Sequence, residues 1–443
     1  MPGTFFGIEI ARRALQTNKQ AMDVTGNNLA NANTTGYTRQ EAVFSTTPAL
    51  PVYTTKYRDG PGQLGTGVEI SEVRRVRDDY LDGQARDNMA EIGYWQTQQD
   101  ALGRVEAVFP EQSDNGLQKL MEGFFTAWQD LSQTPDSQAS RANVRESADA
   151  LANGIRSAYA QLTGIDQDLE KTLSDAGIGQ IRRLNDFAAQ VKKLNDDIVK
   201  ARKMGVTPAD LLDKRDLLLE NMSSLLNISV VHESDGSVSV TSGEKTLVDG
   251  LGSMVNNLTL DDFDNVIANP RGAIGGLIDV REKIKVYLAD LNEMAGAMLE
   301  GVNTLNGANG GSNFFMAGAN PAADIDISGE VNADLDNING QNSLSIAKLR
   351  EELTMKDGTE TFEGFYQMKL IGGIASAGNG AEVNLAGRQA VQQQLESMRQ
   401  SLSGVSVDEE LTKMVQYQYA YQASAKMITT LDEMLAALID MIR

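Results

Sequence analysis

The sequence predicts a mainly α-helical protein with a β-rich insertion. Apolar residues recur every seven positions near both ends of the 443-residue chain, which is typical of helices that pair as a coiled coil. From residue 74 to 227 they recur at spacings of three and four, which indicates a helical bundle. Residues 228–240 instead alternate around Asp235-Gly236, a typical hairpin turn. We therefore expect paired terminal helices, a helical-bundle body and an outer β domain.

The N-terminal helix carries its apolar stripe into an asparagine-rich stretch, NNLANAN, at residues 27–33. Residues 33–36 should end this helix, because Gly36 can adopt a positive φ. The stripe consists of Ile8, Leu15, Met22 and Leu29. The last helix is predicted from about 408 to 442, with an apolar face that includes Met414, Tyr421, Ile428, Leu431, Leu435, Leu438 and Ile442.

Two interpretations of these ends are open. They could form an ordinary helix pair inside a monomer, or they could meet only when neighbouring copies surround them. An isolated helix of this length is marginal in water, and the last helix has a wide apolar face that is costly to expose. The spacing of the apolar residues does not decide between the two.

Between the ends, a further heptad repeat over 277–305 predicts another long helix, and a Gly/Asn/Asp-rich stretch with the strand-like ADIDIS follows it. We divide the chain into three parts. A terminal coiled-coil domain comprises 1–40 with 404–443. A helical body comprises 41–227 with 274–306 and 371–403. A β-rich outer domain comprises 228–273 with 307–370.

The composition excludes several classes of function. With 61 Asp+Glu against 39 Lys+Arg the formal net charge is −22, which disfavours nucleic-acid binding. The chain has no cysteine and one histidine, which excludes thiol nucleophiles, disulfides and Cys/His zinc sites. The lack of cysteine suits export into an oxidising space, although drift explains it equally well. We see no signal peptide and no apolar run long enough to insert in a membrane, so these signs alone indicate a cytoplasmic protein.

No group of residues points to catalysis, a cofactor or a metal. DIDISG at 324–329 matches half of a calcium loop, but its twelfth position is Leu335 where a glutamate is needed. His232 is interpreted as a surface strand residue. Acidic pairs such as Glu409-Glu410 are interpreted as solvated or helix-N-terminal charges. We expect no enzyme activity.

Four blocks of the sequence resemble a known group of proteins. ALQTNKQAMDVTGNNLANANTTGYTRQ (14–40) and the segment 405–442 are similar to the terminal signatures of bacterial flagellar rod, hook and hook-associated proteins. The blocks at 191–250 and 272–307 resemble the family of hook-associated protein 1, which forms the hook–filament junction. Another axial protein (hook-associated protein 3, a rod subunit or a hook subunit) is the alternative, and an axial protein with an enzymatic domain, such as a wall hydrolase, is a more distant one.

The resemblance implies a structural adaptor in a tube whose inner wall is built from paired terminal helices of many copies. It also implies export through the flagellar type III apparatus without a cleaved signal peptide, which replaces the cytoplasmic assignment with an extracellular one. The implied partners are the flagellar hook protein, the next hook-associated protein, other copies of the chain, and an export chaperone on Ile428, Leu431, Leu435 and Leu438. The expected assembly interface comprises Ile8, Leu15, Met22, Asn27, Asn28, Leu29, Asn31, Met414, Tyr421, Ile428, Leu431, Leu435, Leu438 and Ile442.

Overall fold

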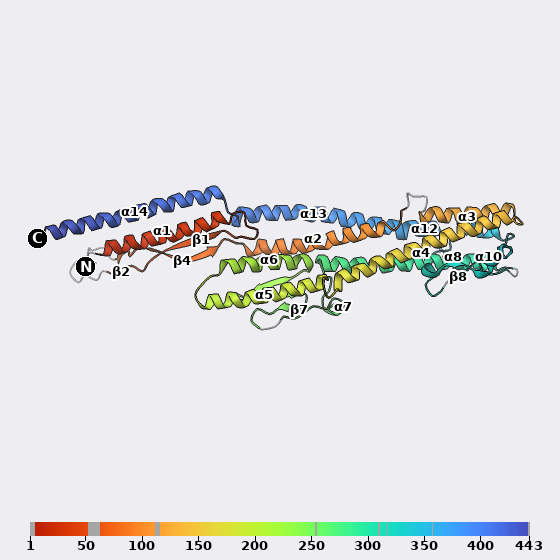
Figure 1. Cartoon of the computed structure of the whole chain (residues 1–443), viewed down its shortest axis with the longest axis horizontal. Coiled ribbons are helices and arrows are strands. Elements are labelled where there is room, and N and C mark those ends of the chain that lie inside the picture. The colour runs from red at the N-terminus through yellow and green to blue at the C-terminus, as the bar shows by residue number, and fades with distance from the viewer. Residues whose placement is uncertain are drawn as a thin grey trace.

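The computed structural model of the chain is a long, narrow molecule with both termini at one end (Figure 1). The structure describes residues 5–51, 63–110, 116–252, 255–308, 311–316, 318–356 and 358–441. Helices dominate these residues and the sheets are small. The predicted fold class, mainly helical with a β-containing insertion, is confirmed.

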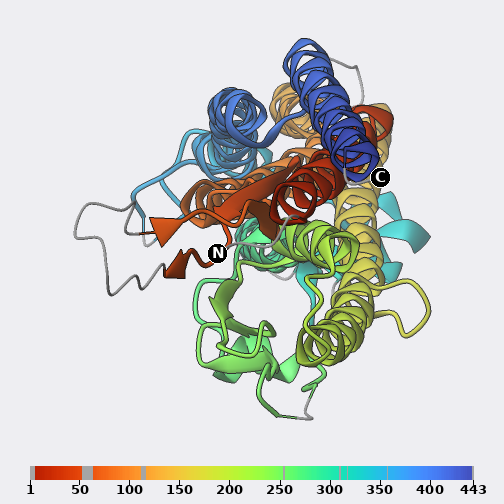
Figure 2. The same cartoon turned by 90° about the vertical axis from the view of Figure 1, so that its left-hand side faces the viewer.

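The terminal helices form the end at which both termini lie. Helix α1 (Phe6–Ala30) and helix α14 (Val407–Asp440) pack along each other, as the end-on view in Figure 2 also shows. Helix α1 ends at Ala30, earlier than the predicted stop at 33–36, and Gly36 follows it with the expected positive φ of 79°. A two-stranded antiparallel ribbon, β1 (Gln40–Thr46) with β4 (Val68–Arg75), lies against α1, and β2 (Leu50–Pro51) pairs with β3 (Gln63–Leu64) beyond it.

The body is a bundle of long helices that share one continuous core. Helix α2 (Asp79–Glu106) packs on both α13 (Gly372–Ser403) and α8 (Gly272–Asn306). The heptad stripe predicted over 277–305 faces this core, because Leu277, Ile284, Leu291 and Met298 are all buried. The other long helices of the body are α3 (Leu117–Gln133), α4 (Gln138–Ser174), α5 (Gln180–Lys203) and α6 (Ala209–Leu225).

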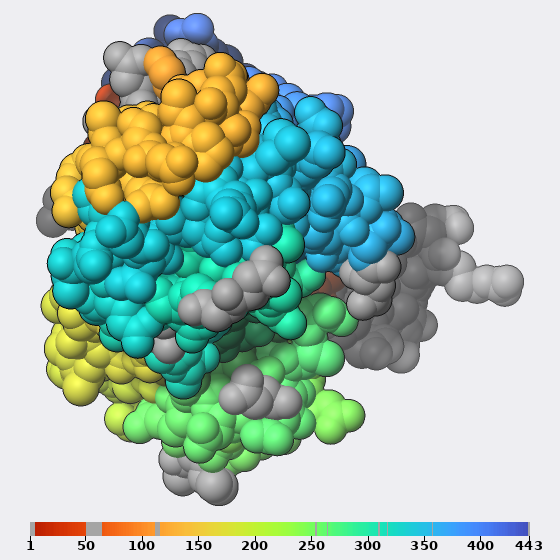
Figure 3. Space-filling view, turned by 90° about the vertical axis from the view of Figure 1, so that its right-hand side faces the viewer, coloured from red at the N-terminus to blue at the C-terminus, as the bar shows by residue number. Residues whose placement is uncertain are grey.

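An aromatic cluster closes the bundle at the end far from the termini. Trp128 of α3 is fully buried, with its ring centroid 5.2 Å from that of Phe314. Phe124 and Phe315 complete the cluster, and the Phe314 and Phe315 rings meet edge to face at 4.8 Å. Figure 3 shows this end, covered by α3 and by the segment that follows α8.

The predicted hairpin is present within a three-stranded sheet on the flank of the body. Strands β5 (Ser229–His232), β6 (Val238–Ser242) and β7 (Lys245–Val248) are antiparallel neighbours, and the short helix α7 (Asp261–Asn265) follows them. Gly236 takes a positive φ of 93° in the turn. The sheet lies beside α5 and not at the outermost end, which is helical (Figure 1).

The prediction that 307–370 is β-rich is wrong. Its described strands are β8 (Phe315–Met316) and β9 (Asp326–Ile327), and these two short strands pair only with each other. The alternation in ADIDIS therefore produces a strand of two residues. The polar residues around it start short helices, because Ser328 caps α10 and Asp334 caps the 3-10 turn η2. The remaining elements are α9 (Pro321–Asp324), α10 (Gly329–Ala333), η2 (Leu335–Asn337), α11 (Ser343–Lys348), α12 (Phe362–Phe365) and the π-helical turn η3 (Tyr366–Ile371).

Candidate assembly interface: the paired terminal helices

Helices α1 and α14 run antiparallel, with the start of one beside the end of the other. Near the start of α1, Gly7 lies against Leu431, so that a methyl group added to Gly7 would be 3.2 Å from Leu431 Cδ1. Near the end of α1, Asn28 contacts Glu410, which lies in the first turn of α14. Gly7 and Asn28 are three heptads apart, so they share one face of α1. This face marks the seam between the two helices.

The seam residues of α1 are small or polar. Between Gly7 and Asn28 the same heptad face carries Ala11, Ala14, Asn18, Ala21 and Thr25, of which Ala11, Ala21 and Thr25 are buried. The sequence therefore predicted the seven-residue period correctly but the wrong phase. Small side chains let two helix backbones approach closely, and they do not stand out in an apolar pattern.

The predicted residues of α1 lie beside this seam. Ile8, Leu15, Met22 and Leu29 are all half-buried. Asn27 is exposed, and Asn31 is half-buried with its amide donating to the Asn27 carbonyl oxygen at 3.0 Å.

On α14 the predicted stripe faces α1 over most of its length. Met414, Tyr421, Ile428, Leu431 and Leu435 are half-buried. Leu438 is exposed, because α14 continues past Leu431, the residue that lies beside the start of α1. Ile442 lies outside the described residues.

The Asn28 side chain joins three segments of the chain at one point. Its Nδ2 donates to the Gln40 carbonyl oxygen at 2.8 Å and to Glu410 Oε2 at 2.9 Å. Its Oδ1 accepts from the Tyr37 hydroxyl and from the Gln40 backbone N–H, both at 2.9 Å. Asn28 is 1% exposed, so all four bonds form away from water. The amide fixes the end of α1 to the linker and to α14.

Glu410 lies in the first turn of α14, as expected for a helix-N-terminal charge. It is 1% exposed, so of the two alternatives the solvated charge does not apply to it. Asn28 and Lys413 both donate to its carboxylate, the latter at 2.9 Å. Glu409 does remain exposed and pairs with Arg39 at 3.2 Å. Glu410 lies seven residues before Tyr417 and 21 before Leu431, so the heptad pattern of α14 already separates it from Glu409, and Asn28 supplies its partner.

Tyr37 stays protonated at this point. Burial raises the pKa of its phenol to about 12, and the charges of Asp213, Asp210 and Glu410 act in the same direction. The hydroxyl therefore keeps the proton that it donates to Asn28 Oδ1.

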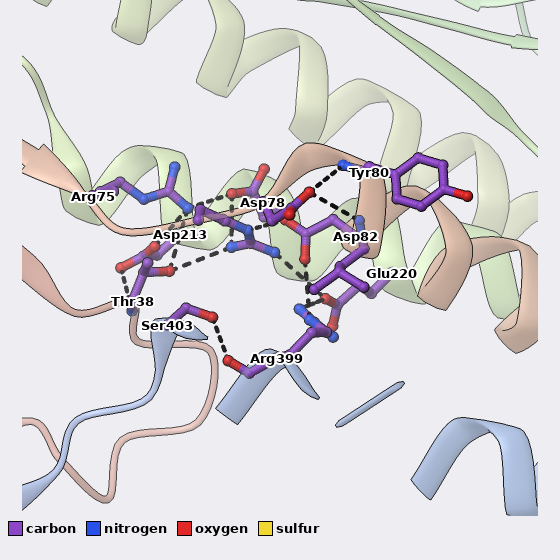
Figure 4. Close-up of polar contacts among 12 residues, drawn as sticks. Thr38, Arg75, Asp78, Tyr80, Asp82, Asp213, Glu220, Arg399 and Ser403 are labelled. Carbon is purple, nitrogen blue, oxygen red and sulfur yellow. Dashed lines mark hydrogen bonds and ion pairs between the residues drawn. The ribbon is translucent and has the colours of Figure 1, made fainter. Parts of the chain in front are cut away.

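A cluster of ionised side chains lies where the terminal pair joins the body (Figure 4). Arg75 pairs with Asp213 at 2.8 Å and with Asp216, and Arg77 pairs with Asp216 at 2.9 Å. We call the whole group the junction cluster, and its members are Arg75, Arg77, Asp82, Asp213, Asp216, Glu220 and Arg399. No sequence pattern predicts this cluster, because its members come from four separate segments of the chain.

Two aspartates of the junction cluster differ in their pKa. Burial raises the pKa of Asp213 above its usual value, although Arg75 opposes this effect. Burial alone would also raise the pKa of Asp216, but Arg77 and Arg75 outweigh it and lower that pKa. Asp216 therefore keeps its charge more firmly than Asp213.

The outer face of α14 carries an exposed apolar stripe. Tyr419 is 68% exposed and Ile439 is 64% exposed. The stripe comprises Val407, Leu411, Val415, Tyr419, Met427 and Met434, and Leu438 and Ile439 add exposed apolar surface beyond the part of α14 that packs on α1. The stripe residues recur every four to eight positions along a helix of 34 residues, so a large apolar surface faces solvent.

The residues considered as metal or proton sites do not converge. Across the described part of the chain no three His, Asp or Glu side chains are placed to hold a metal ion. Asp326 pairs with Arg156 at 3.3 Å, and His232 is exposed at the end of β5. None of the described helices has the length and apolar character that crossing a membrane requires.

Three family models match the chain. The flagellar hook-associated protein FlgK helical domain matches residues 102–315. The flagella basal body rod protein model matches 8–38, and the C-terminal model of flagellar basal body rod FlgEFG proteins matches 398–441. The two rod models cover most of α1 and all of α14, so the terminal pair is the part of the chain that is similar to flagellar rod proteins.

Individual proteins agree with these models. A solved structure of the flagellar hook junction protein FlgK from Burkholderia pseudomallei has the same fold, with a TM-score of 0.64 at 14% identity, over 72% of this chain and 100% of that one. Flagellar hook-associated protein 1 from Salmonella typhimurium is 26% identical over 55% of this chain and 42% of its own length. Flagellar hook-associated protein 1 from Bacillus subtilis is 30% identical over 99% of both chains. This chain therefore belongs to the flagellar hook-associated protein 1 family.

Proposed function

We propose that this chain is a structural adaptor that joins the flagellar hook to the filament. Its terminal helix pair builds the wall of the axial tube by packing on the pairs of neighbouring copies. Hook protein lies on one side of the resulting ring and the next hook-associated protein on the other. The proposal assigns the chain no catalytic role.

The exposed stripe of α14 carries this proposal. The inner face of α14 is already in contact with α1, so the outer face is a second apolar surface with no cover in the single chain. Burying one such side chain contributes on the order of 1.5–3 kcal/mol. A surface of this kind favours association, and the matches to rod proteins at both terminal helices indicate association within the flagellar axis.

The half-buried apolar residues of α1 can also contact neighbouring copies in the proposed tube. Ile8, Leu15, Met22 and Leu29 lie beside the seam and keep part of their surface free for a neighbouring copy. Asn27 is exposed on the same helix, and beside the bond from its Nδ2 to the Tyr37 hydroxyl it keeps a second N–H for a neighbouring chain. We keep these residues and the α14 stripe as the proposed assembly interface.

Export completes the proposal. The chain would leave the cell through the flagellar type III apparatus without a cleaved signal peptide. An export chaperone would cover α14 before secretion, around Ile428, Leu431, Leu435 and Leu438. The absence of cysteine from the sequence suits a chain that travels unfolded into an oxidising space.

Electron microscopy of isolated hooks tests the proposal. Hooks incubated with the unchanged chain should gain a cap of extra density at the distal end. The double variant Leu438→Asp/Ile439→Asp should remain folded and fail to add this cap. Ile178→Asp is the matched control, because Ile178 is 79% exposed but lies between α4 and α5 on the body. Capping by the double variant at the level of the control would refute the proposal.

A further inference from the structure

The terminal pair is connected to the body through few elements. Helices α1 and α14 pack on each other, and α1 also packs on β1 and β4. Within the described residues neither helix has comparable packing against α2, α6 or α13. The direction of the pair relative to the body therefore depends on the β1–β4 ribbon and on two linkers, residues 31–39 and 404–406.

Each of these connections reaches the body at the junction cluster. The backbone N–H of Thr38, in the first linker, donates to Asp213 Oδ2 at 3.2 Å. Arg75 is the last residue of β4, and Arg77 lies two residues after it and two residues before α2 begins at Asp79. The second linker leaves α13 beside Arg399, whose carbonyl oxygen accepts from Ser403 Oγ at 2.7 Å.

The two linkers are also tied to each other beside the cluster. The Arg39 backbone N–H donates to the Ser403 carbonyl oxygen at 3.1 Å, and the Arg39 guanidinium donates to the Leu402 carbonyl oxygen at 3.1 Å. The Arg39 carbonyl oxygen accepts from Val76 N–H at 2.9 Å, between the two cluster arginines. Movement of one linker would therefore disturb the other and the end of β4.

The body side of the cluster comes from three helices. Helix α6 supplies Asp213, Asp216 and Glu220, helix α2 supplies Asp82 and helix α13 supplies Arg399. Arg399 pairs with Asp82 at 3.0 Å and with Glu220, and Arg77 pairs with Asp82. Removing one charged side chain from such a buried group leaves the opposite charges of its partners unpaired, which is destabilising.

The junction has little apolar packing to replace these charges. A cleft of about 200 Å³ lies between the linkers and the body. Most of its lining is polar or glycine, and it includes Thr35, Gly36, Arg77, Glu220, Arg399 and Ser403. Charge pairs and backbone hydrogen bonds are therefore the main contacts that hold the linkers.

We infer that the junction cluster is a latch that fixes the direction of the terminal helix pair relative to the body. With the cluster intact, the free chain holds the pair in one direction. With one central charge removed, the pair and the body stay folded but swing relative to each other. Asp216 is central because it accepts from both Arg75 and Arg77.

Distance measurements between two spin labels test the latch. The chain contains no cysteine, so introduced cysteines are the only labelling sites. Lys426→Cys places one spin label on α14, in the terminal pair, and Lys193→Cys places the other on α5, in the body. Both positions are exposed. Pulsed dipolar spectroscopy on the free full-length chain should give one narrow distance distribution. Asp216→Asn should roughly double its width, as expected when a hinge is released.

Two further variants make the test decisive. Asp166→Asn is the control, because Asp166 forms a comparably buried pair with Arg281 at 2.9 Å, but within the body. It should leave the distribution narrow. Arg399→Gln removes a charge from the opposite side of the cluster and should broaden the distribution as Asp216→Asn does, which settles the question if Asp216→Asn does not fold.

A narrow distribution in folded Asp216→Asn and Arg399→Gln would overturn the latch. Equal broadening in Asp166→Asn would also overturn it, since any lost ion pair would then have the same effect. Circular dichroism confirms that each variant keeps its helices. The test uses the free chain, so its result is independent of whether the proposed junction role is correct.

Discussion

The Asn28 amide donates a hydrogen bond of 2.9 Å to the carboxylate of Glu410, 382 residues further along the chain. Both side chains are buried, and the bond lies where α1 ends and α14 begins. Because the helices are antiparallel, this one contact sets their register. It also explains the asparagine-rich end of α1, where a side chain with two donors and an acceptor oxygen meets three segments at once.

Asn28→Ala should loosen the terminal pair. The substitution removes four hydrogen bonds and leaves the buried Glu410 carboxylate with Lys413 as its remaining donor. A hydrogen bond to a charged group contributes about 1.5–3 kcal/mol. Hydrogen exchange should therefore speed up in α1 by at least about tenfold while the body is unchanged. Asn27→Ala is the control, since Asn27 is exposed and its bond to the Tyr37 hydroxyl, at 3.2 Å, is to a neutral group. Equal exchange in both variants would contradict the role of Asn28.

Ala21→Leu should separate the two helices. Ala21 is fully buried in the seam of small residues, and overpacking a tight contact costs about 1–3 kcal/mol. Met22→Leu, one position away and half-buried, should have almost no effect. Thermal unfolding of the terminal pair, followed by circular dichroism, compares the two. A larger loss of thermal stability in Met22→Leu than in Ala21→Leu would contradict this seam. It would indicate that the face with Ile8, Leu15, Met22 and Leu29 contacts α14, as the apolar pattern predicted.

The seam shows what could and could not be predicted from sequence. The seven-residue period of α1 follows from helix geometry and was correct. Its phase was wrong because Gly7, Ala11 and Ala21 pack closely without being strongly apolar, so a search for large side chains selects the neighbouring face. On α14 the predicted Met414, Tyr421, Ile428, Leu431 and Leu435 are half-buried, because the residues of this face are themselves large, whereas Leu438 is exposed.

Polar contacts could not be predicted for a different reason. Glu409 and Glu410 are adjacent and chemically identical. The heptad pattern places Glu410 on the face towards α1, but the Asn28 amide that partners its buried carboxylate is found only in the tertiary structure. The same holds for Asp213 and Asp216, whose partners come from β4 and the segment after it. The error over 307–370 was local, because alternation over a few residues does not show whether a partner strand is available.

Gly36→Ala should strain the first linker. Gly36 has a φ of 79°, which residues with a Cβ rarely adopt, while Leu217 leaves room for a methyl group at 3.8 Å. The cost is therefore one of backbone conformation, about 1–2 kcal/mol. Gly36→Asn should cost less, because asparagine tolerates this region. Chemical denaturation of both variants measures the difference, and equal stability of Gly36→Ala and the unchanged chain would contradict the assigned strain.

Acid should remove the contribution of Asp216. Its pKa in the folded chain is lowered below the ordinary value of 3.8, with Arg77 and Arg75 outweighing burial. The stabilisation is therefore complete above the ordinary pKa and is lost as the pH falls through the lower folded value. Asp216→Asn should cost about 3 kcal/mol near neutral pH. The difference between the two chains in urea unfolding should shrink below pH 3.8, and a constant difference would show that Asp216 is not ionised in the folded state.

Labelling of a single cysteine at position 434 tests the central claim most directly, that the outer stripe of α14 is buried between copies. Met434 is exposed in the single chain, so Met434→Cys should react quickly with a maleimide dye when the protein is free. Once the protein has assembled onto hooks, the account predicts that this cysteine is protected, while Ile178→Cys on the body still reacts. Equal labelling of position 434 in free and assembled protein would contradict the account.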